Sequence, residues 1–292
     1  MVISNKPQIE LVQFDKYDIP GLIELSRSVG WDYDENEIGT VLSSGTIFGH
    51  KNAEGNIVSS AAIIPYDTFL ASIGMVIVNK DFRGMGLGKE ATRKCIESVS
   101  KETVIMLIST EEGKRLYEKM GFNTVDFVHK YLCDNYITNT KARPLNNSEI
   151  IIEEFNGVDI DELLTIDGDA FGDKRSRFLM NRIKQSENCL VAKDMNGAIV
   201  GYGLSILGPI NLILGPIVAP DYQTALVLID KLSSEHRGKL RIDVPSGNKE
   251  LMMLLENSGF VNVSQPPIMV INSDKMPSRN DTLFGIAAQV FG

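Results

Sequence analysis

The stretch of sequence that decides the fold is Val76-Ile77-Val78-Asn79-Lys80-Asp81-Phe82-Arg83-Gly84-Met85-Gly86-Leu87-Gly88-Lys89. An apolar strand is predicted to end at Val78, a glycine-rich turn follows, and a helix begins near Gly86. Alternating glycines let the backbone curl so that several N–H groups point the same way. The helix start adds unpaired N–H groups and the positive end of its dipole. With the charges of Arg83 and Lys89, this predicts a site for a phosphate or pyrophosphate, whereas the alternative is a tight connection without a ligand.

Two common nucleotide motifs do not fit this loop. A Walker A loop requires GxxxxGK[ST], but here Arg83 stands at the first glycine position and Glu90 replaces the Ser or Thr. A Rossmann fingerprint requires GxGxxG near the start of a βαβ unit, whereas this loop reads GxGxG and its strand follows three others. Neither nucleotide-binding motif therefore describes this loop.

The surrounding pattern predicts a mixed sheet with helices on both faces, because meandering strands precede a strand-helix-strand-helix-strand order. Strands are expected at residues 9–14, 46–51, 57–64, 69–78, 104–109 and 124–132. Helices are expected at residues 19–29, 35–43, 86–99 and 111–120.

The chain also repeats itself. Residues 116–125 align with residues 254–263, with Leu, Glu, Gly, Phe and Val recurring in register, and residues 55–58 and 74–78 align with residues 197–200 and 215–219. Several matches at nearly one spacing indicate two copies of one fold. We therefore expect one domain at residues 1–137, a linker at 138–148 and a second domain at 149–292.

Composition limits the class of protein. The 292 residues suit two domains, and 43% hydrophobic with 23% charged residues excludes disorder, collagen and coiled coil as whole-chain readings. The net charge of −9 disfavours a nucleic-acid or anionic-membrane partner. Nothing in the sequence indicates the oligomeric state.

The cellular compartment is predicted from the cysteines and from two segments. Three widely spaced cysteines form no disulfide framework, which indicates a reducing compartment. The first residues contain no continuous apolar segment, so no signal peptide is expected. The uncharged run 198–220 is long enough to cross a bilayer, but its turn signal at Gly208-Pro209 favours two buried strands. The expected location is the cytoplasm.

Two motifs of the chain resemble those of a known family. Val78-x-x-x-x-Arg83-Gly84-x-Gly86-x-Gly88 resembles the acetyl-CoA motif of the GNAT N-acetyltransferase superfamily, and the segment Leu116-Tyr117-Glu118-Lys119-Met120-Gly121-Phe122 resembles its second element. The whole chain is similar to bacterial tandem GNAT proteins with a divergent C-terminal copy. The resemblance implies the α/β (α+β) class, with two tandem GNAT-like domains, each a mixed, mostly antiparallel sheet flanked by helices.

The resemblance implies an acetyl-CoA-dependent N-acetyltransferase, an acyltransferase that moves an acetyl group by direct attack of a small amine. Acetyl-CoA would be the co-substrate, with no metal. Tyr117 would protonate the departing thiolate, although it could instead be part of the core. The expected cofactor-binding residues are Val76, Ile77, Val78, Arg83, Gly84, Met85, Gly86, Leu87, Gly88 and Lys89.

Two details depart from the family pattern. Lys80 stands where many relatives have Pro, and Thr110 stands where many have an Asn that contacts the pantetheine arm. No general base is evident; Asp67 and His50 are the nearest candidates, and each suits an ordinary turn or surface position better.

In this family the segment between the first two helices walls the acceptor pocket, which here places Trp31 and four carboxylates at residues 30–37. An aromatic wall with negative charge suits an amine, including a cationic one. The alternative is a solvated helix start, which is favoured for the acids and left open for Trp31.

No metal site is predicted. The run Asp167-Gly168-Asp169 hints at a calcium loop, but Phe171 stands at a ligand position and Phe178 replaces the closing Glu. The three histidines are isolated.

The second copy has lost the cofactor motif. Asp221 and its successors stand where the first copy has Arg83 and its glycines, and Leu255 replaces Tyr117. The second copy is therefore expected to pack on the first, to shape the acceptor site or to bind a regulator. The rival function is a non-catalytic acetyl-CoA-binding sensor or interaction module; a scaffold with two inert copies conflicts with the intact loop.

Overall fold

The computed structural model describes residues 9–138 and 150–292. The first eight residues, at which the absence of a signal peptide is predicted, and all but the first residue of the expected linker 138–148 lie outside the described residues. The strands of the described part join into one 14-stranded sheet that runs through both halves. The domain boundaries stay a prediction.

The elements of the first half are the predicted strands and helices, with bounds shifted by a few residues at most, and two short 3-10 helices in addition. They are β1 (Ile9–Phe14), η1 (Lys16–Asp18), α1 (Ile19–Ser28), α2 (Glu35–Ser44), β2 (Thr46–Asn52), β3 (Ile57–Pro65), β4 (Leu70–Val78), η2 (Lys80–Phe82), α3 (Leu87–Glu97), β5 (Val104–Ile108), α4 (Glu111–Glu118) and β6 (Asn123–Cys133).

The second half repeats this order, and its last strands are divided. Its elements are β7 (Ile151–Glu154), α5 (Ile160–Phe171), α6 (Ser176–Gln185), β8 (Asn188–Lys193), β9 (Ile199–Leu207), β10 (Asn211–Val218), α7 (Tyr222–Ser233), β11 (Lys239–Pro245), α8 (Lys249–Asn257), β12 (Val261–Ser264), β13 (Pro267–Ile271) and β14 (Leu283–Gly285). The uncharged run 198–220 forms β9 and β10. No helix in the described ranges is long and apolar enough to cross a membrane.

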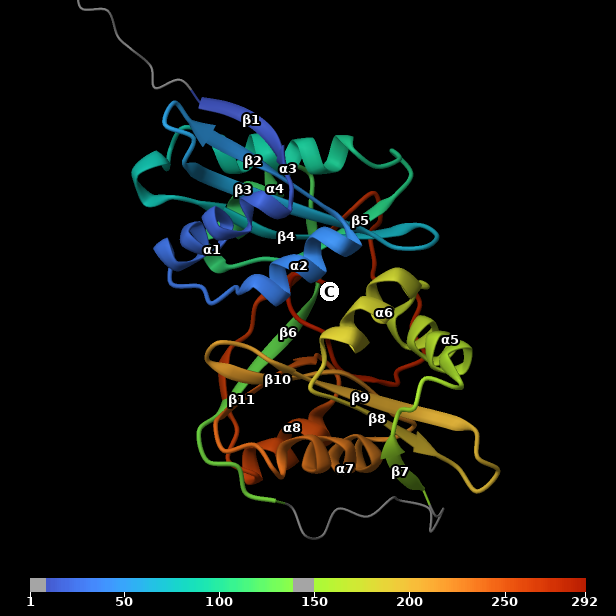
Figure 1. The fold of residues 1–292 in the computed structure, drawn as a ribbon. Coiled ribbons are helices and arrows are strands. Elements are labelled where there is room, and N and C mark those ends of the chain that lie inside the picture. The colour runs from blue at the N-terminus through green and yellow to red at the C-terminus, as the bar shows by residue number, and fades with distance from the viewer. Residues whose placement is uncertain (1–8, 139–149) are drawn as a thin grey trace, which may run out of the picture.

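The layers follow from strand alternation. On β3, Ala61 and Ile63 belong to the core on the α3 side, whereas Ala62 and Ile64 belong to the core on the α1–α2 side. A strand that buries both faces reads as a continuous apolar run. In Figure 1, α3 lies beyond the part of the sheet that belongs to the first half, α7 and α8 lie beyond the part that belongs to the second half, and α1, α2, α5 and α6 lie between the two parts.

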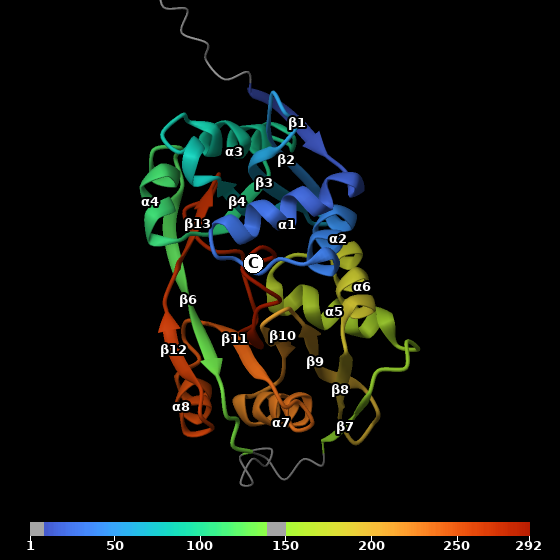
Figure 2. The same cartoon turned by 60° about the vertical axis from the view of Figure 1, so that its left-hand side comes forward.

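The two halves exchange strands at equivalent places. β13, from the end of the second half, pairs with both β5 and β6 of the first. Residues 128–133 of β6 pair with β11, and residues 130–132 also pair with β12, so this part of β6 lies inside the second half. Figure 2 shows β6 running from one half into the other. Each half therefore completes its sheet with a strand of its neighbour.

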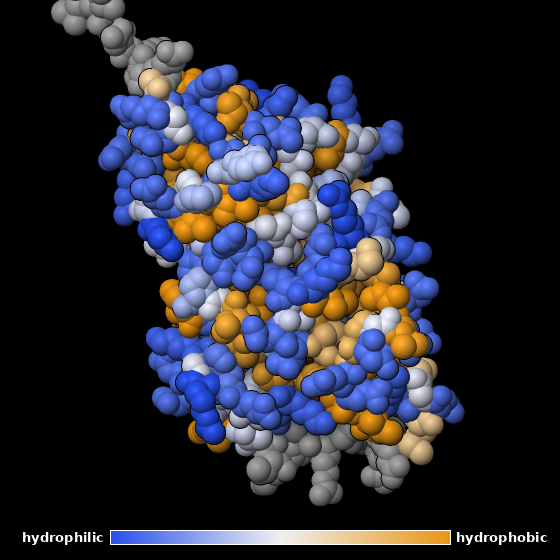
Figure 3. All heavy atoms as spheres, viewed as in Figure 1, coloured by the Kyte–Doolittle hydropathy of each residue, from blue (hydrophilic) through white to orange (hydrophobic). Residues whose placement is uncertain are grey.

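The middle layer contains a hydrophobic core shared by both halves, into which the last residues of the chain insert. Phe291 is fully buried, and Tyr66 donates a hydrogen bond to its carbonyl oxygen. Asp173 of the second half accepts hydrogen bonds from the main-chain N–H groups of Phe69 (3.0 Å) and Leu70 (2.9 Å). On the face drawn in Figure 3, hydrophobic residues are interspersed with hydrophilic ones over both halves.

Candidate functional site

At the glycine-rich loop, the main chain that leads into α3 is not covered by neighbouring side chains. Gly84 and Gly86 have φ of +81° and +83°, and a Cβ added at either would meet no heavy atom within 4 Å. No side chain caps α3. The helical hydrogen bonds begin with the one from Glu90 N–H to Gly86 O (3.0 Å), so the N–H groups of the preceding helical residues have no partner within the helix. These N–H groups and the helix dipole suit an anion. The structure therefore fits the pyrophosphate expected here.

A groove opens beside this loop because β4 and β5 separate. The two strands pair in parallel from Leu70 with Val104 as far as Ile73 with Leu107. Beyond that point β4 bulges between Gly74 and Ile77, where Met75 has φ of +50° and its carbonyl oxygen accepts a hydrogen bond from Ser60 Oγ (2.7 Å). Main-chain groups of the last residues of β4 thus have no β5 partner and are available to a ligand.

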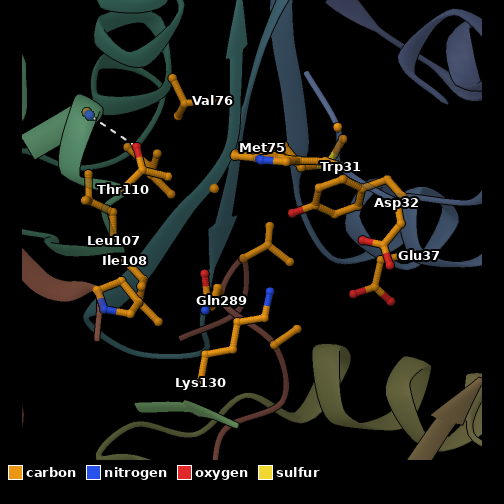
Figure 4. Close-up of a pocket in the computed structure, with 18 of the residues that line it drawn as sticks. Trp31, Asp32, Glu37, Met75, Val76, Leu107, Ile108, Thr110, Lys130 and Gln289 are labelled. Carbon is orange, nitrogen blue, oxygen red and sulfur yellow. Dashed lines mark hydrogen bonds between the residues drawn. The ribbon is translucent and has the colours of Figure 1, made fainter. Parts of the chain in front are cut away.

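One cavity of about 800 Å³ joins the loop, the groove and the space between the halves. In Figure 4, Val76 and Thr110 lie on one side of it, Trp31 and Asp32 on another, and Lys130 points into it from below. Of the ten residues expected to bind the cofactor, Val76, Val78, Arg83, Gly84 and Gly88 line the cavity. The other five do not line it: Ile77 and Leu87 are buried, whereas Met85, Gly86 and Lys89 are exposed.

Tyr117 lines the cavity from α4. Its ring stacks edge-on against Phe122, with centroids 5.9 Å apart, and only 7% of the residue is exposed. Its hydroxyl makes no hydrogen bond to the part of the chain that the structure describes. Burial raises the pKa of Tyr117, so the phenol keeps its proton at neutral pH. Thr110 lines the cavity and caps α4 by accepting a hydrogen bond from Gly113 N–H (3.1 Å).

The segment between α1 and α2 also faces the cavity, and its acids have different partners. Asp34 caps α2 by accepting a hydrogen bond from Glu37 N–H (2.8 Å), as expected for a helix start. The Glu37 carboxylate binds the guanidinium of the fully buried Arg182 and accepts a hydrogen bond from Gln185 (2.8 Å). Asp32 has no ion pair within the described ranges, so its charge faces the cavity uncompensated by a direct contact.

Neither candidate base named from the sequence lines the cavity. Asp67 accepts hydrogen bonds from the main chain (3.0 Å) and hydroxyl (2.6 Å) of Ser176, which joins the two halves. The buried His50 contacts Ser59 through Nδ1 (2.7 Å) and Glu90 through Nε2 (3.3 Å).

The second half, one of whose expected roles is to shape the acceptor site, lines the cavity through residues that no sequence motif singles out. Lys130 enters from the exchanged part of β6, Arg241 from β11 and Gln289 from the last residues of the chain. The β9–β10 turn at Gly208 and Pro209 also lines the cavity. These residues belong to no local motif, because long-range strand pairing brings them to the site.

The equivalent groove of the second half is filled by the chain itself. β10 pairs with β11 only at residues 211–213, and where the two strands separate, β14 pairs with β10 at Ile217 and Val218. At the start of α7, Asp221 accepts a hydrogen bond from Thr224 N–H (2.7 Å), so a carboxylate already occupies the place of an anion. Both parts of a cofactor site are therefore blocked in this half.

No group of metal-ligating side chains occurs in the ranges that the structure describes. In the rejected calcium-like run, Asp167 instead lies in α5 and pairs with the buried Arg175 (2.8 Å).

Each half of the chain matches a known protein family model. Residues 17–122 match the Acetyltransferase (GNAT) family, and residues 163–285 match the Acetyltransferase (GNAT) domain. The chain is 35% identical over 284 residues to the uncharacterized N-acetyltransferase YitH of Bacillus subtilis, covering 97% of this chain and 98% of that protein.

Two solved structures share the fold over nearly the whole chain. A putative acetyltransferase from Pyrococcus horikoshii is 21% identical with a TM-score of 0.79, covering 97% of this chain and 96% of that one. A tandem GNAT protein from the clavulanic acid biosynthesis pathway is 13% identical with a TM-score of 0.65, covering 90% of this chain and 98% of that one.

Proposed function

This chain belongs to the GNAT family of N-acetyltransferases, and from that membership we propose that its first half transfers the acetyl group of acetyl-CoA to the amine of a small acceptor by direct attack. The observation that carries the proposal is the continuous cavity of about 800 Å³, which is lined by the glycine-rich loop, the β4 bulge and Trp31. Such a cavity has room for a phosphate-bearing donor beside the loop and an amine beside Trp31, with the β4 bulge between them.

The loop residues supply the donor site. Main-chain N–H groups at residues 84–89 would hold the pyrophosphate, and Arg83, whose side chain is half exposed, would add a charge-assisted contact. The unpaired edge of β4 would hold the pantetheine arm by main-chain hydrogen bonds. Acetyl-CoA, when bound, supplies an activated acetyl group as a thioester.

The residues around the bulge supply the chemistry. The amine nitrogen forms a bond to the acetyl carbon while the carbon–sulfur bond breaks. A main-chain N–H among Val76–Val78 stabilises the negative charge on the carbonyl oxygen, and the Tyr117 hydroxyl gives its proton to the sulfur. The uncompensated Asp32 carboxylate attracts the acceptor ammonium and takes one proton from it, which frees the nitrogen lone pair for attack. Water takes the second proton, which the nitrogen loses as the carbon–sulfur bond breaks. Solvent then restores both groups.

The test is release of free CoA thiol from acetyl-CoA in the presence of a panel of primary amines. Amine-dependent release, with acetylated amine found by mass spectrometry, supports transfer. Tight acetyl-CoA binding without transfer to any amine would instead favour the sensor or interaction module.

A further inference from the structure

Lys130 is an unpaired cation in the wall of the cavity. It lies in the part of β6 that enters the second half, directly opposite Asp243 of β11, and Arg241 follows two residues away on the same face of β11. Within the described ranges, the Lys130 ammonium has neither an ion pair nor a hydrogen bond. The strand exchange thus places a positive charge beside the acceptor side of the cavity.

The nearest carboxylate is already occupied by other groups. Asp243 is buried, and its Oδ2 accepts a hydrogen bond from Arg241 Nε (2.8 Å) and forms an ion pair with Arg241 Nη2 (2.8 Å). Its Oδ1 accepts a hydrogen bond from Gln289 Nε2 (2.8 Å). Asp243 and Arg241 therefore neutralise each other, and the charge of Lys130 remains available for a ligand.

The carboxylate of Asp32 lies across the cavity from Lys130. Figure 4 places Asp32 on the side of the α1–α2 segment and Lys130 on the side of the second half. Burial and the neighbouring Arg241 lower the pKa of Lys130, while Asp243 and Asp32 oppose this change. A bound anion would relieve the unfavourable environment of this ammonium.

We infer that the acceptor is an amine that also carries a carboxylate, with the carboxylate bound by Lys130 and the amine directed to Asp32. The inference rests on the proposed function for the identity of the bound molecule as an acceptor. It makes the part of β6 that pairs with β11 a specificity element of the site, and it departs from the cationic acceptor that the acidic segment alone suggests.

Trp31 provides a direct readout of binding, because it is the single tryptophan of the chain and lines the cavity. The experiment titrates its fluorescence in the full chain with α-amino acids, their α-carboxamides and the corresponding decarboxylated amines. We expect the best amino acid to bind about 10- to 100-fold more tightly than its amide, the range for a charge-assisted contact.

Variants of Lys130 assign that preference to its charge. Lys130→Met should bind acid and amide within about threefold of each other, whereas Lys130→Arg should keep most of the preference. Lys101→Met, which removes an exposed lysine outside the cavity, is the matched control and should behave like the unaltered chain.

The outcomes separate this inference from the proposed function. Equal binding of acid and amide, a preference that survives Lys130→Met, or no binding of any carboxylate-bearing amine overturns the inference. Thiol release with the same panel tests the function. A Lys130-dependent preference without acetyl transfer would defeat the proposed function alone, and transfer that ignores the carboxylate would defeat this inference alone.

Discussion

Tyr117 offers the sharpest test at the scale of a single residue, because Tyr117→Phe removes one hydroxyl and leaves the ring against Phe122. If the hydroxyl protonates the thiolate, kcat should fall about 100-fold, the low end for general acid catalysis, with acetyl-CoA affinity nearly unchanged. Steady-state kinetics and calorimetry measure the two quantities. A kcat within about a factor of two would place Tyr117 in the core and leave the donor site standing.

The pH dependence of the same residue follows from its burial. Because burial favours the neutral phenol, the pKa of Tyr117 lies above its ordinary value of 10.0, and the proton is retained as pH rises. The ratio of kcat between the unaltered chain and Tyr117→Phe should therefore stay constant from about pH 7 to about pH 10, where an ordinary tyrosine would be half ionised. A ratio that falls across this range would contradict the assignment.

At the scale of elements, a charged substitution in the loop between β4 and α3 should weaken acetyl-CoA binding. Gly86→Glu brings a negative charge into the space proposed for the pyrophosphate, so acetyl-CoA affinity should fall at least about 100-fold by calorimetry. Gly86→Ala is the control, since it imposes the same strain at φ +83° without charge. Both variants should lose similar stability in thermal unfolding. Equal affinity losses in the two would show that backbone strain, not charge, causes the effect.

The elements that carry local signals were predictable from the sequence. The β4–loop–α3 unit lies within residues 70–97, and its glycines, arginine and apolar strand are all adjacent in the chain. Trp31 and Tyr117 likewise belong to short recognisable segments, and both line the cavity. Lys130 gave no such signal, since an isolated lysine in a predicted strand is usually solvated. Its place in the wall depends on pairing with β11, more than 100 residues away in the chain.

At the scale of the whole molecule, two similar halves should bind one acetyl-CoA. The second half offers neither an open groove, because β14 fills it, nor a free helix start, because Asp221 caps α7. Calorimetry of the full chain should therefore give about one equivalent, and Gly86→Glu should abolish that binding event. Two equivalent sites, or one site that survives Gly86→Glu, would show that the second half binds the cofactor.

The internal repeat predicted two copies, and the family matches to each half confirm them. Repetition could not predict how the copies combine. The alignment ends at residues 116–125 and 254–263, just before or within the strands that cross over. Which half receives β13 depends on the packing of both cores, and no short segment encodes that choice.

The exchange of β6 and β13 has a consequence for the order of events during synthesis. β5 and β6 leave the ribosome early, while the strand that fits between them is among the last to emerge. At about 5–20 residues per second, the delay from Cys133 to Ile271 lasts roughly 7 to 28 seconds. During that time the nascent first half exposes unpaired strand edges, which are templates for association with other chains. In the folded protein β13 covers these edges of β5 and β6, whereas in the nascent chain they stay unpaired until β13 has been synthesised.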